Sequence, residues 1–134
     1  MADKIHLNIL TPYGHYFEGD VDFLEVHSEK YNLGILPNHA PLISTLVVGK
    51  MIIRASNREL VYAIGGGVIN VERDKTTLIL NSIERSDEID VLRAEDAKRR
   101  AEERLANKDD SIDVNRAKAA LLRAINRIQI SSKY

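Results

Sequence analysis

Apolar and polar residues alternate through much of the first 85 residues of the chain. Ile5, Leu7 and Ile9 are separated by single polar residues, which is the two-residue period of a half-buried strand. Turn-forming residues interrupt the apolar segments about every ten residues, a spacing typical of a β-sandwich or flattened barrel rather than of βαβ units. Further strands rich in β-branched residues are predicted in the segments 21–26, 51–54, 60–64, 68–71 and 76–80.

The pattern changes at Ser86, after which the spacing of apolar residues becomes helical. All seven glycines and all three prolines precede this residue. Ser86 is a suitable N-cap and is followed by acidic residues, so we predict a helix from there to about Ala106. After an Asn-Lys-Asp-Asp break, Ser111 or Asp110 is expected to cap a second helix that ends near Ile130. So short a connection implies an antiparallel hairpin, with each helix about 30 Å long.

One face of each predicted helix carries mostly small apolar residues. Alanine lets two helices approach closely but buries little surface, and burial stabilises by roughly 25 cal/mol per Å². The hairpin is therefore expected to be weakly held and to open at low cost. The expected seam consists of Ala94, Ala97, Ala101 and Leu105 on the first helix and Val114, Ala117, Leu121, Ala124, Ile125 and Ile128 on the second.

Arginines line up beside this seam. Residues four or seven positions apart lie on one side of a helix, and Asp90 lies one turn before the first arginine. Closing the hairpin would gather up to five guanidinium groups near that carboxylate, which suits an anionic ligand such as a nucleoside triphosphate. The alternative is a solvated face with i,i+4 ion pairs, which the spacing alone favours. The two stripes are Arg93 and Arg100 on the first helix and Arg116, Arg123 and Arg127 on the second.

Composition narrows the classes of function. The net charge is −1 and no cysteine is present, so we expect neither nucleic-acid binding through bulk charge nor a disulfide or thiolate metal site. No signal peptide or membrane span is indicated, and any link to a membrane is expected to go through a partner. No Ser-His-acid or paired-carboxylate pattern indicates catalysis.

Gly65–Gly67 lacks the residues of a phosphate loop and is predicted to serve close backbone packing. No metal-ligand spacing connects His6, His15, His27 and His39.

The segment Leu33–Leu42 contains two prolines and a glycine. Such a stiff loop serves either as a crossing between sheets or as a contact surface for a partner. Its sequence, Leu-Gly-Ile-Leu-Pro-Asn-His-Ala-Pro-Leu, resembles the signature of the epsilon subunit of bacterial F-type ATP synthases. The resemblance covers essentially the whole chain and is greatest to Bacillus-type members. Three further features agree in order and spacing: an opening strand that leads to Thr11 and Pro12, the turn Gly65–Val68, and Ile-Asp-Val-Leu-Arg-Ala at 89–94.

The resemblance implies an α+β fold, with a ten-stranded antiparallel β-sandwich in residues 1–85 and a regulatory two-helix hairpin in residues 86–134. It also implies a non-catalytic subunit of the central rotor, held at the cytoplasmic face of the bacterial membrane by its partners. In the family the sandwich binds the gamma subunit and the c-ring. The c-ring region matches Tyr31, Asn32 and His39, and Asn32 stands where many members have an acidic residue.

The resemblance further implies regulation by ATP. In the family the hairpin folds against the sandwich, or extends along gamma towards the alpha and beta subunits and blocks ATP hydrolysis; Bacillus-type members bind one ATP on the folded hairpin. Two alternatives are a rotor adaptor and inhibitor that does not sense nucleotide, and a ligand-binding or enzymatic β-sandwich with a coiled-coil tail. No carboxylate cluster for magnesium is apparent, which leaves a need for it open. The implied ATP contacts are Glu84, Ile89, Asp90, Arg93, Arg100, Arg116, Arg123 and Arg127.

Overall fold

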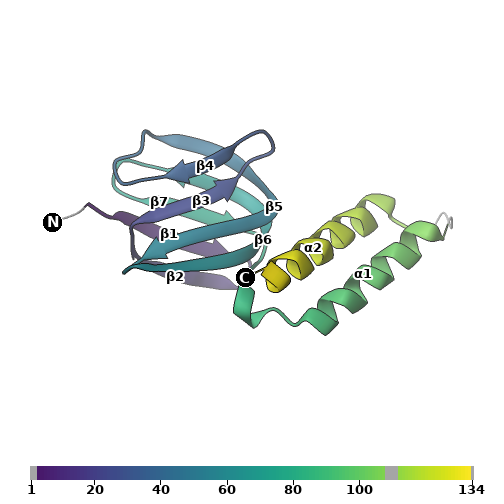
Figure 1. The fold of residues 1–134 in the computed structure, drawn as a ribbon. Coiled ribbons are helices and arrows are strands. Elements are labelled where there is room, and N and C mark those ends of the chain that lie inside the picture. The colour runs from purple at the N-terminus through teal and green to yellow at the C-terminus, as the bar shows by residue number, and fades with distance from the viewer. Residues whose placement is uncertain (1–2, 108–111, 134) are drawn as a thin grey trace.

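The computed structural model describes residues 3–107 and 112–133. In this part of the chain, eight strands are followed by a short 3-10 turn, η1, and two helices (Figure 1). The strands are β1 (Ile5–Thr11), β2 (Gly14–Val21), β3 (Phe23–His27), β4 (Asn32–Ile35), β5 (Leu42–Ala55), β6 (Arg58–Val71), β7 (Thr76–Leu80) and β8 (Ile83–Arg85). The turn and helices are η1 (Ser86–Glu88), α1 (Val91–Ala106) and α2 (Val114–Lys133).

Two long strands allow the sheet to form both layers of the sandwich. Strands β5 and β6 have 14 residues each and pair antiparallel along nearly their whole length. The first half of β5 and the second half of β6 lie with β7, β1 and β2, whereas their other halves lie with β3, β4 and β8. The eight described strands thus supply ten strand segments, which accounts for the expected number. Among the described strands, only the pair β1–β7 is parallel, which departs from the expected all-antiparallel sandwich. Strands so distant in sequence are free to pair in parallel because no hairpin turn joins them.

Gly65–Gly67 lies where β6 passes from one layer to the other. Gly66 and Gly67 have φ angles of 87° and 154°, which side chains rarely tolerate. A Cβ atom on Gly67 would lie 2.0 Å from the carbonyl oxygen of Ile79. The structure therefore agrees with the interpretation of these glycines as positions of close backbone packing.

The main core lies between the two layers. Ile5, Leu7 and Ile9 are buried while His6 is exposed, as the alternation in β1 predicts. Further along, Met51–Ile53 in β5 and the run Val61–Ile64 in β6 are buried at every position. One face of these segments meets the core and the other meets the helices, so they carry continuous apolar runs.

The first helix begins later than the sequence predicted. Ser86 is the first residue of η1 and does not cap α1. The N-cap is Asp90, whose carboxylate accepts a hydrogen bond from the backbone N–H of Arg93 at 3.1 Å. The prediction was wrong because Ile89 has extended backbone angles and packs in a buried apolar cluster, which separates η1 from the helix. The end of α1 at Ala106 agrees with the prediction.

The second helix begins at Val114 and continues to Lys133, one turn beyond the predicted end. Ahead of it, the Asp113 carboxylate accepts a hydrogen bond from the backbone N–H of Arg116 at 3.0 Å. This is the bond that a capping side chain makes. The predicted caps, Ser111 and Asp110, lie outside the described residues.

The two helices pack against each other through small side chains. The seam alanines buried almost completely are Ala94, Ala101, Ala117 and Ala124. Val114, expected in the seam, is 49% exposed because it lies in the first turn of α2, at the end far from the sandwich. Helix α2 provides most of the contact with β5 and β6, and α1 lies on its outer side (Figure 1). Neither described helix has an apolar run long enough to cross a lipid bilayer.

Candidate functional site

The last turns of α2 attach the hairpin to the sandwich. Ile130 is only 4% exposed and packs in an apolar cluster on the outer face of β5 and β6. This cluster is separate from the main core, so its burial depends on the helices and not on the packing between the two layers of the sandwich. We call it the docking cluster, and its members are Ile52, Val61, Ala63, Ile89 and Ile130.

Two polar contacts lie beside the docking cluster. The Asn126 side-chain amide donates a hydrogen bond to the carbonyl oxygen of Gly49 at 3.1 Å. The Arg127 guanidinium donates to both carboxylate oxygens of Glu84, at 2.8 and 3.2 Å. A two-point arginine–carboxylate pair of this kind fixes orientation as well as adding attraction, so it sets how α2 lies against β8.

A cavity of about 500 Å³ lies where the helices meet the sandwich. The sandwich contributes walls from β5, β6 and the segment after β7, including Val48 and Glu84. Helix α1 contributes Arg93, and α2 contributes Arg123 and Arg127. Because both parts of the chain build its walls, the cavity has this composition only while the hairpin is docked.

The charge around the cavity is unevenly neutralised. Arg127 is paired with Glu84, whereas no described side chain pairs with the guanidinium of Arg93 or Arg123. Guanidinium groups bind phosphate and carboxylate oxygens through two parallel hydrogen bonds. The arrangement therefore suits an anion that is large enough to contact both helices.

Four of the eight implied ATP contacts line this cavity, namely Glu84, Arg93, Arg123 and Arg127. Asp90 is exposed and caps α1, and Ile89 is buried in the docking cluster. Arg100 lies about two turns further along α1, and Arg116 lies about 16 Å from Arg127 along the axis of α2. The structure thus gathers three of the five arginines around one cavity, whose lining includes Glu84 but not Asp90.

The residues that match the c-ring region fall into two places. Tyr31 is exposed and Asn32 begins β4, where its side-chain oxygen lies 2.5 Å from Nδ1 of His27. His39 lies beyond the other end of β4, in the loop that leads to β5. This strand separates the two places, so the three side chains do not form one cluster.

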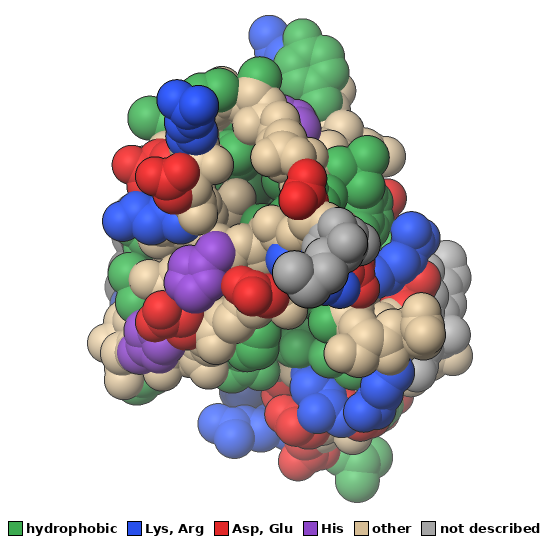
Figure 2. Space-filling model, turned by 90° about the vertical axis from the view of Figure 1, so that its left-hand side faces the viewer, with side chains coloured by type: hydrophobic (Ala, Val, Ile, Leu, Met, Phe, Trp, Pro, Cys, Tyr) green, Lys and Arg blue, Asp and Glu red, His purple; other side chains and the backbone are tan. Residues whose placement is uncertain are grey.

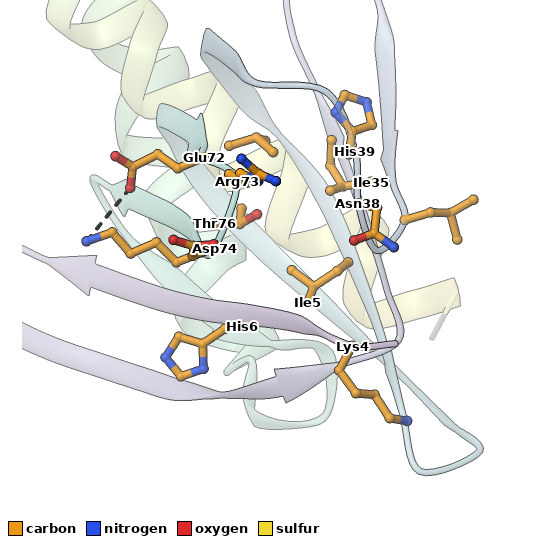
Figure 3. Close-up of a pocket in the computed structure, with 13 residues that line it drawn as sticks. Lys4, Ile5, His6, Ile35, Asn38, His39, Glu72, Arg73, Asp74 and Thr76 are labelled. Carbon is orange, nitrogen blue, oxygen red and sulfur yellow. Dashed lines mark ion pairs between the residues drawn. The ribbon is translucent and has the colours of Figure 1, made fainter. Parts of the chain in front are cut away.

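His39 borders a second, smaller cavity of about 50 Å³. It lies between the start of β1, the loop after β4 and the turn from β6 to β7 (Figure 3). Lys75 and Glu72 form an ion pair of 3.8 Å across that turn. Pockets for drug-sized ligands have volumes of about 300–1,000 Å³, so this cavity is too small for a nucleotide.

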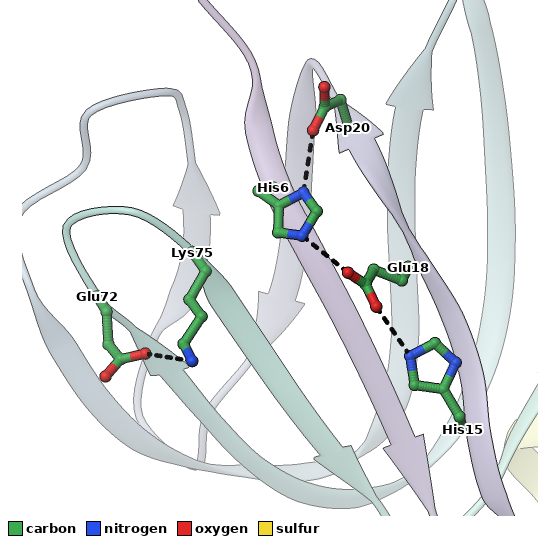
Figure 4. Close-up of polar contacts among 6 residues, drawn as sticks. All are labelled: His6, His15, Glu18, Asp20, Glu72 and Lys75. Atoms are coloured by element: carbon green, nitrogen blue, oxygen red, sulfur yellow. Dashed lines mark hydrogen bonds and ion pairs between the residues drawn. The ribbon is translucent and has the colours of Figure 1, made fainter.

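Imidazole and carboxylate groups alternate across β1 and β2 (Figure 4). His6 lies 3.1 Å from Asp20 through Nδ1 and 3.1 Å from Glu18 through Nε2, and His15 lies 3.4 Å from Glu18. Hydrogen bonds to Asp20 and then to Glu18 raise the pKa of His6 above its ordinary value of 6.5. Among the described residues, neither this row nor any other group of three His, Cys, Asp or Glu side chains could hold a metal ion.

Charges of both signs are mixed on the end of the sandwich that Figure 2 shows. Acidic and basic side chains alternate there, with histidines next to acidic groups. No large area of one sign is visible on this face. Such a surface favours contacts with specific groups over attraction by bulk charge.

The docking contacts were not predicted from the sequence. A signal for the apolar ones was present, because 51–53 and 61–64 are apolar without alternation. Such runs indicate strands that are buried on both faces, and the second face needed a covering element. Asn126 gave no comparable signal, because a polar residue is ordinary on an amphipathic helix.

Two family descriptions together match nearly the whole chain. Residues 4–86 match the beta-sandwich domain of the ATP synthase Delta/Epsilon chain, and residues 87–132 match its long alpha-helix domain. The chain belongs to the ATP synthase delta/epsilon family. Membership in this family confirms the predicted fold class, a β-sandwich followed by two helices.

Relatives in this family are similar along most of their length. The ATP synthase epsilon chain of Pelotomaculum thermopropionicum is 47% identical over 109 residues, which is 81% of each chain. That of Alkalihalophilus pseudofirmus is 42% identical over 130 residues, covering 96% of this chain and 98% of the relative. That of Caldanaerobacter subterraneus is 38% identical over 135 residues, covering 100% and 98%. These matches confirm the resemblance to epsilon subunits and the expectation of a non-catalytic subunit.

Solved structures share the fold at low sequence identity. A chain in the Euglena gracilis mitochondrial ATP synthase, solved as OSCP/F1/c-ring, aligns with 100% of this chain and 84% of its own, with a TM-score of 0.81 and 15% identity. A chain in the central stalk and c-ring of the Tetrahymena thermophila enzyme aligns with 98% and 96%, with a TM-score of 0.63 and 17% identity. The sandwich and hairpin are therefore an arrangement that occurs in assembled ATP synthases.

Proposed function

We propose that this chain is a central-stalk subunit of a proton-translocating F-type ATP synthase and restrains ATP hydrolysis through its helices. Residues 1–85 hold it on the rotor between gamma and the c-ring, with Tyr31, Asn32 and His39 at the c-ring. Residues 86–134 dock on the sandwich or extend towards the alpha and beta subunits, where they block hydrolysis. ATP acts as a regulatory ligand that favours the docked state. The subunit lies at the cytoplasmic face of the cell membrane through its partners.

The cavity between the helices and the sandwich carries the nucleotide part of this proposal. Arg93 and Arg123 supply guanidinium groups for phosphates, while Val48 and Ile83 supply apolar wall from the sandwich. A ligand that needs both walls binds the docked form alone. ATP at a hundredfold excess over its dissociation constant would then stabilise that form by about 2.7 kcal/mol.

The weakness of the docking contact supports a switch of this size. The docking cluster has five members, and the seam between the helices relies on alanines that bury little area. A two-state element moves only if a ligand's preference for one state is comparable with the free-energy gap between them. A few kcal/mol from ATP is sufficient for a contact this small.

An exposed apolar patch on the layer that contains β7, β1 and β2 supports binding to gamma. Val68 lies opposite Thr45 on one neighbouring strand and Ile79 on the other, so these side chains share one face of the sheet. The side-chain oxygen of Asn8 on β1, in the same layer, is buried without a hydrogen-bond partner in the described chain. Contiguous exposed apolar surface typically marks a protein interface. The exposed members of the patch are Ile43, Val47, Val68 and Ile79.

Calorimetric titration with ATP, with and without Mg²⁺, tests the nucleotide site. We expect Arg93→Gln and Arg123→Gln each to weaken ATP binding by about tenfold or more, the effect of one lost hydrogen bond to a charged group. Arg99→Gln is the matched control, because Arg99 lies on α1 but pairs with Asp96 outside the cavity. If all three variants bind ATP as tightly as the unmodified chain, the site is wrong and a rotor adaptor without nucleotide sensing remains.

A reversible crosslink tests the inhibitory part. The chain has no cysteine, so Gly49→Cys with Asn126→Cys places the sole thiols at a contact between β5 and α2. In the assembled complex, the oxidised variant should hydrolyse ATP faster than the reduced one, because its helices cannot extend. Equal inhibition before and after reduction would contradict the switch. It would not contradict the proposed ATP site, which the titrations test separately.

A further inference from the structure

Tyr13 lies at the cavity although it was not among the implied ATP contacts. It forms part of the wall together with Arg93, Arg123 and Arg127. At 98%, its side chain is the most exposed of the large hydrophobic ones in the described residues. Single exposed apolar side chains are common on protein surfaces, but this one shares the cavity wall with Arg93 and Arg123, whose guanidinium groups pair with no described side chain.

The turn between β1 and β2 fixes the backbone at Tyr13. Its backbone N–H donates a hydrogen bond to the Thr11 hydroxyl at 3.2 Å, and that hydroxyl donates to the carbonyl of Gly14 at 3.2 Å. Pro12 restricts the backbone before it, and Gly14 has a φ of 115° that lets the chain reverse. The backbone of so constrained a turn needs little further ordering when its side chain contacts a ligand.

We propose that Tyr13 stacks on the base of the bound nucleotide and so makes the cavity prefer nucleotides to inorganic polyphosphates. This inference rests on the proposed function. The guanidinium groups belong to the helices, whereas Tyr13, Val48 and Ile83 belong to the sandwich. The phosphates therefore face the helices, and the base faces the wall that carries the aromatic ring. Stacking uses a π-face that every base has, so Tyr13 recognises a nucleobase without selecting which one.

Paired titrations with ATP and inorganic tripolyphosphate separate the two ends of the ligand. Tyr13→Ala should weaken ATP binding about tenfold, within the range for loss of one aromatic–base stack, and leave tripolyphosphate binding unchanged. Tyr13→Phe should bind ATP like the unmodified chain, since the ring is kept. Tyr16→Ala is the matched control, because Tyr16 is also exposed but does not line the cavity.

A fluorescent variant reports the contact directly. The chain contains no tryptophan, so Tyr13→Trp introduces a single indole at the proposed position. Addition of ATP should change its emission, and addition of tripolyphosphate should not. Because the Tyr13 side chain is exposed in a turn, we expect Tyr13→Ala, Tyr13→Phe and Tyr13→Trp to unfold at the same temperature as the unmodified chain.

The outcomes distinguish this inference from the function on which it rests. If the unmodified chain binds neither ATP nor tripolyphosphate, the proposed site and the role of Tyr13 both fail. If ATP binds and Arg123→Gln weakens it while Tyr13→Ala does not, the stacking role alone is overturned. An equal loss of ATP and tripolyphosphate in Tyr13→Ala also overturns it, because the base would then play no part.

Discussion

Replacement of Ile130 by alanine should shift the helices away from the sandwich. Ile130 is 4% exposed and lies in the docking cluster rather than in the main core. The change deletes three carbon atoms from a buried position, and burial of each stabilises by about 0.8 kcal/mol. The loss of about 2.4 kcal/mol falls on the docked state alone and moves the docking equilibrium by about 50-fold.

A distance measurement between the sandwich and α2 detects this shift. Asp74→Cys and Lys118→Cys provide sites for spin labels on two exposed positions, and no native cysteine competes for the label. In the labelled chain that keeps Ile130, we expect one short distance between the two labels, which corresponds to the docked hairpin. In Ile130→Ala a second, longer distance should appear, and saturating ATP should reduce its share because ATP favours the docked form.

Leu122→Ala is the control for loss of an apolar side chain from the same helix. Leu122 is 53% exposed, so its deletion should leave the distance distribution unchanged. The unfolding temperature of the sandwich should be the same in both variants. Identical distance distributions for Ile130→Ala and Leu122→Ala would show that Ile130 does not hold the helices on the sandwich. A sandwich destabilised by the loss of Ile130 would show that this residue belongs to the main core.

Three further substitutions should change the free energy of unfolding by amounts that follow from the contacts of the replaced residue. Glu84→Gln removes the ion pair with Arg127 and should lower the free energy of urea unfolding by about 0.5–1 kcal/mol, because the pair is 25% and 31% exposed. Because its pKa is raised in the folded state, His6 contributes stability that is complete below pH 6.5 and is lost as the pH rises through that raised pKa. His6→Gln removes this contribution. The unfolding free energy of the variant should therefore change less with pH above pH 6.5 than that of the unmodified chain. Gly67→Ala should lower the free energy of urea unfolding by more than about 3 kcal/mol, because its Cβ would lie 2.0 Å from a carbonyl oxygen of β7. Gly14→Ala should lower it by about 1 kcal/mol, because that position has a positive φ but open space around the added Cβ.

Each of these three has its own control. For the ion pair, a double-mutant cycle with Arg127→Gln should give a favourable coupling energy, and a coupling of zero would contradict the contact. For the pH dependence, His39→Gln is the comparison, since no described carboxylate pairs with His39; a profile for His6→Gln that matches the unmodified chain argues against the Asp20 and Glu18 contacts. Equal losses for Gly67→Ala and Gly14→Ala would mean that β6 and β7 do not approach closely.

Local rules predicted most of the elements. Alternation identified β1, and the buried positions in it are those that the pattern assigned to the core. The helical spacing after Ser86 identified both helices and the end of the first. The cap at Ser86 was wrong, since a good capping residue says only where a helix can begin. The actual start at Val91 follows from the burial of Ile89 against strands that are distant in sequence.

The order and spacing of residues along the chain were enough to predict the division into strands and helices, the family and the arginine stripes. They did not specify which residues meet. Helical periodicity places Arg93, Arg123 and Arg127 on faces, and the docking of α2 then brings them to one cavity with Glu84 and the turn that carries Tyr13. Docking depends on the fit between two surfaces that the chain folds separately, and no spacing within either one specifies that fit.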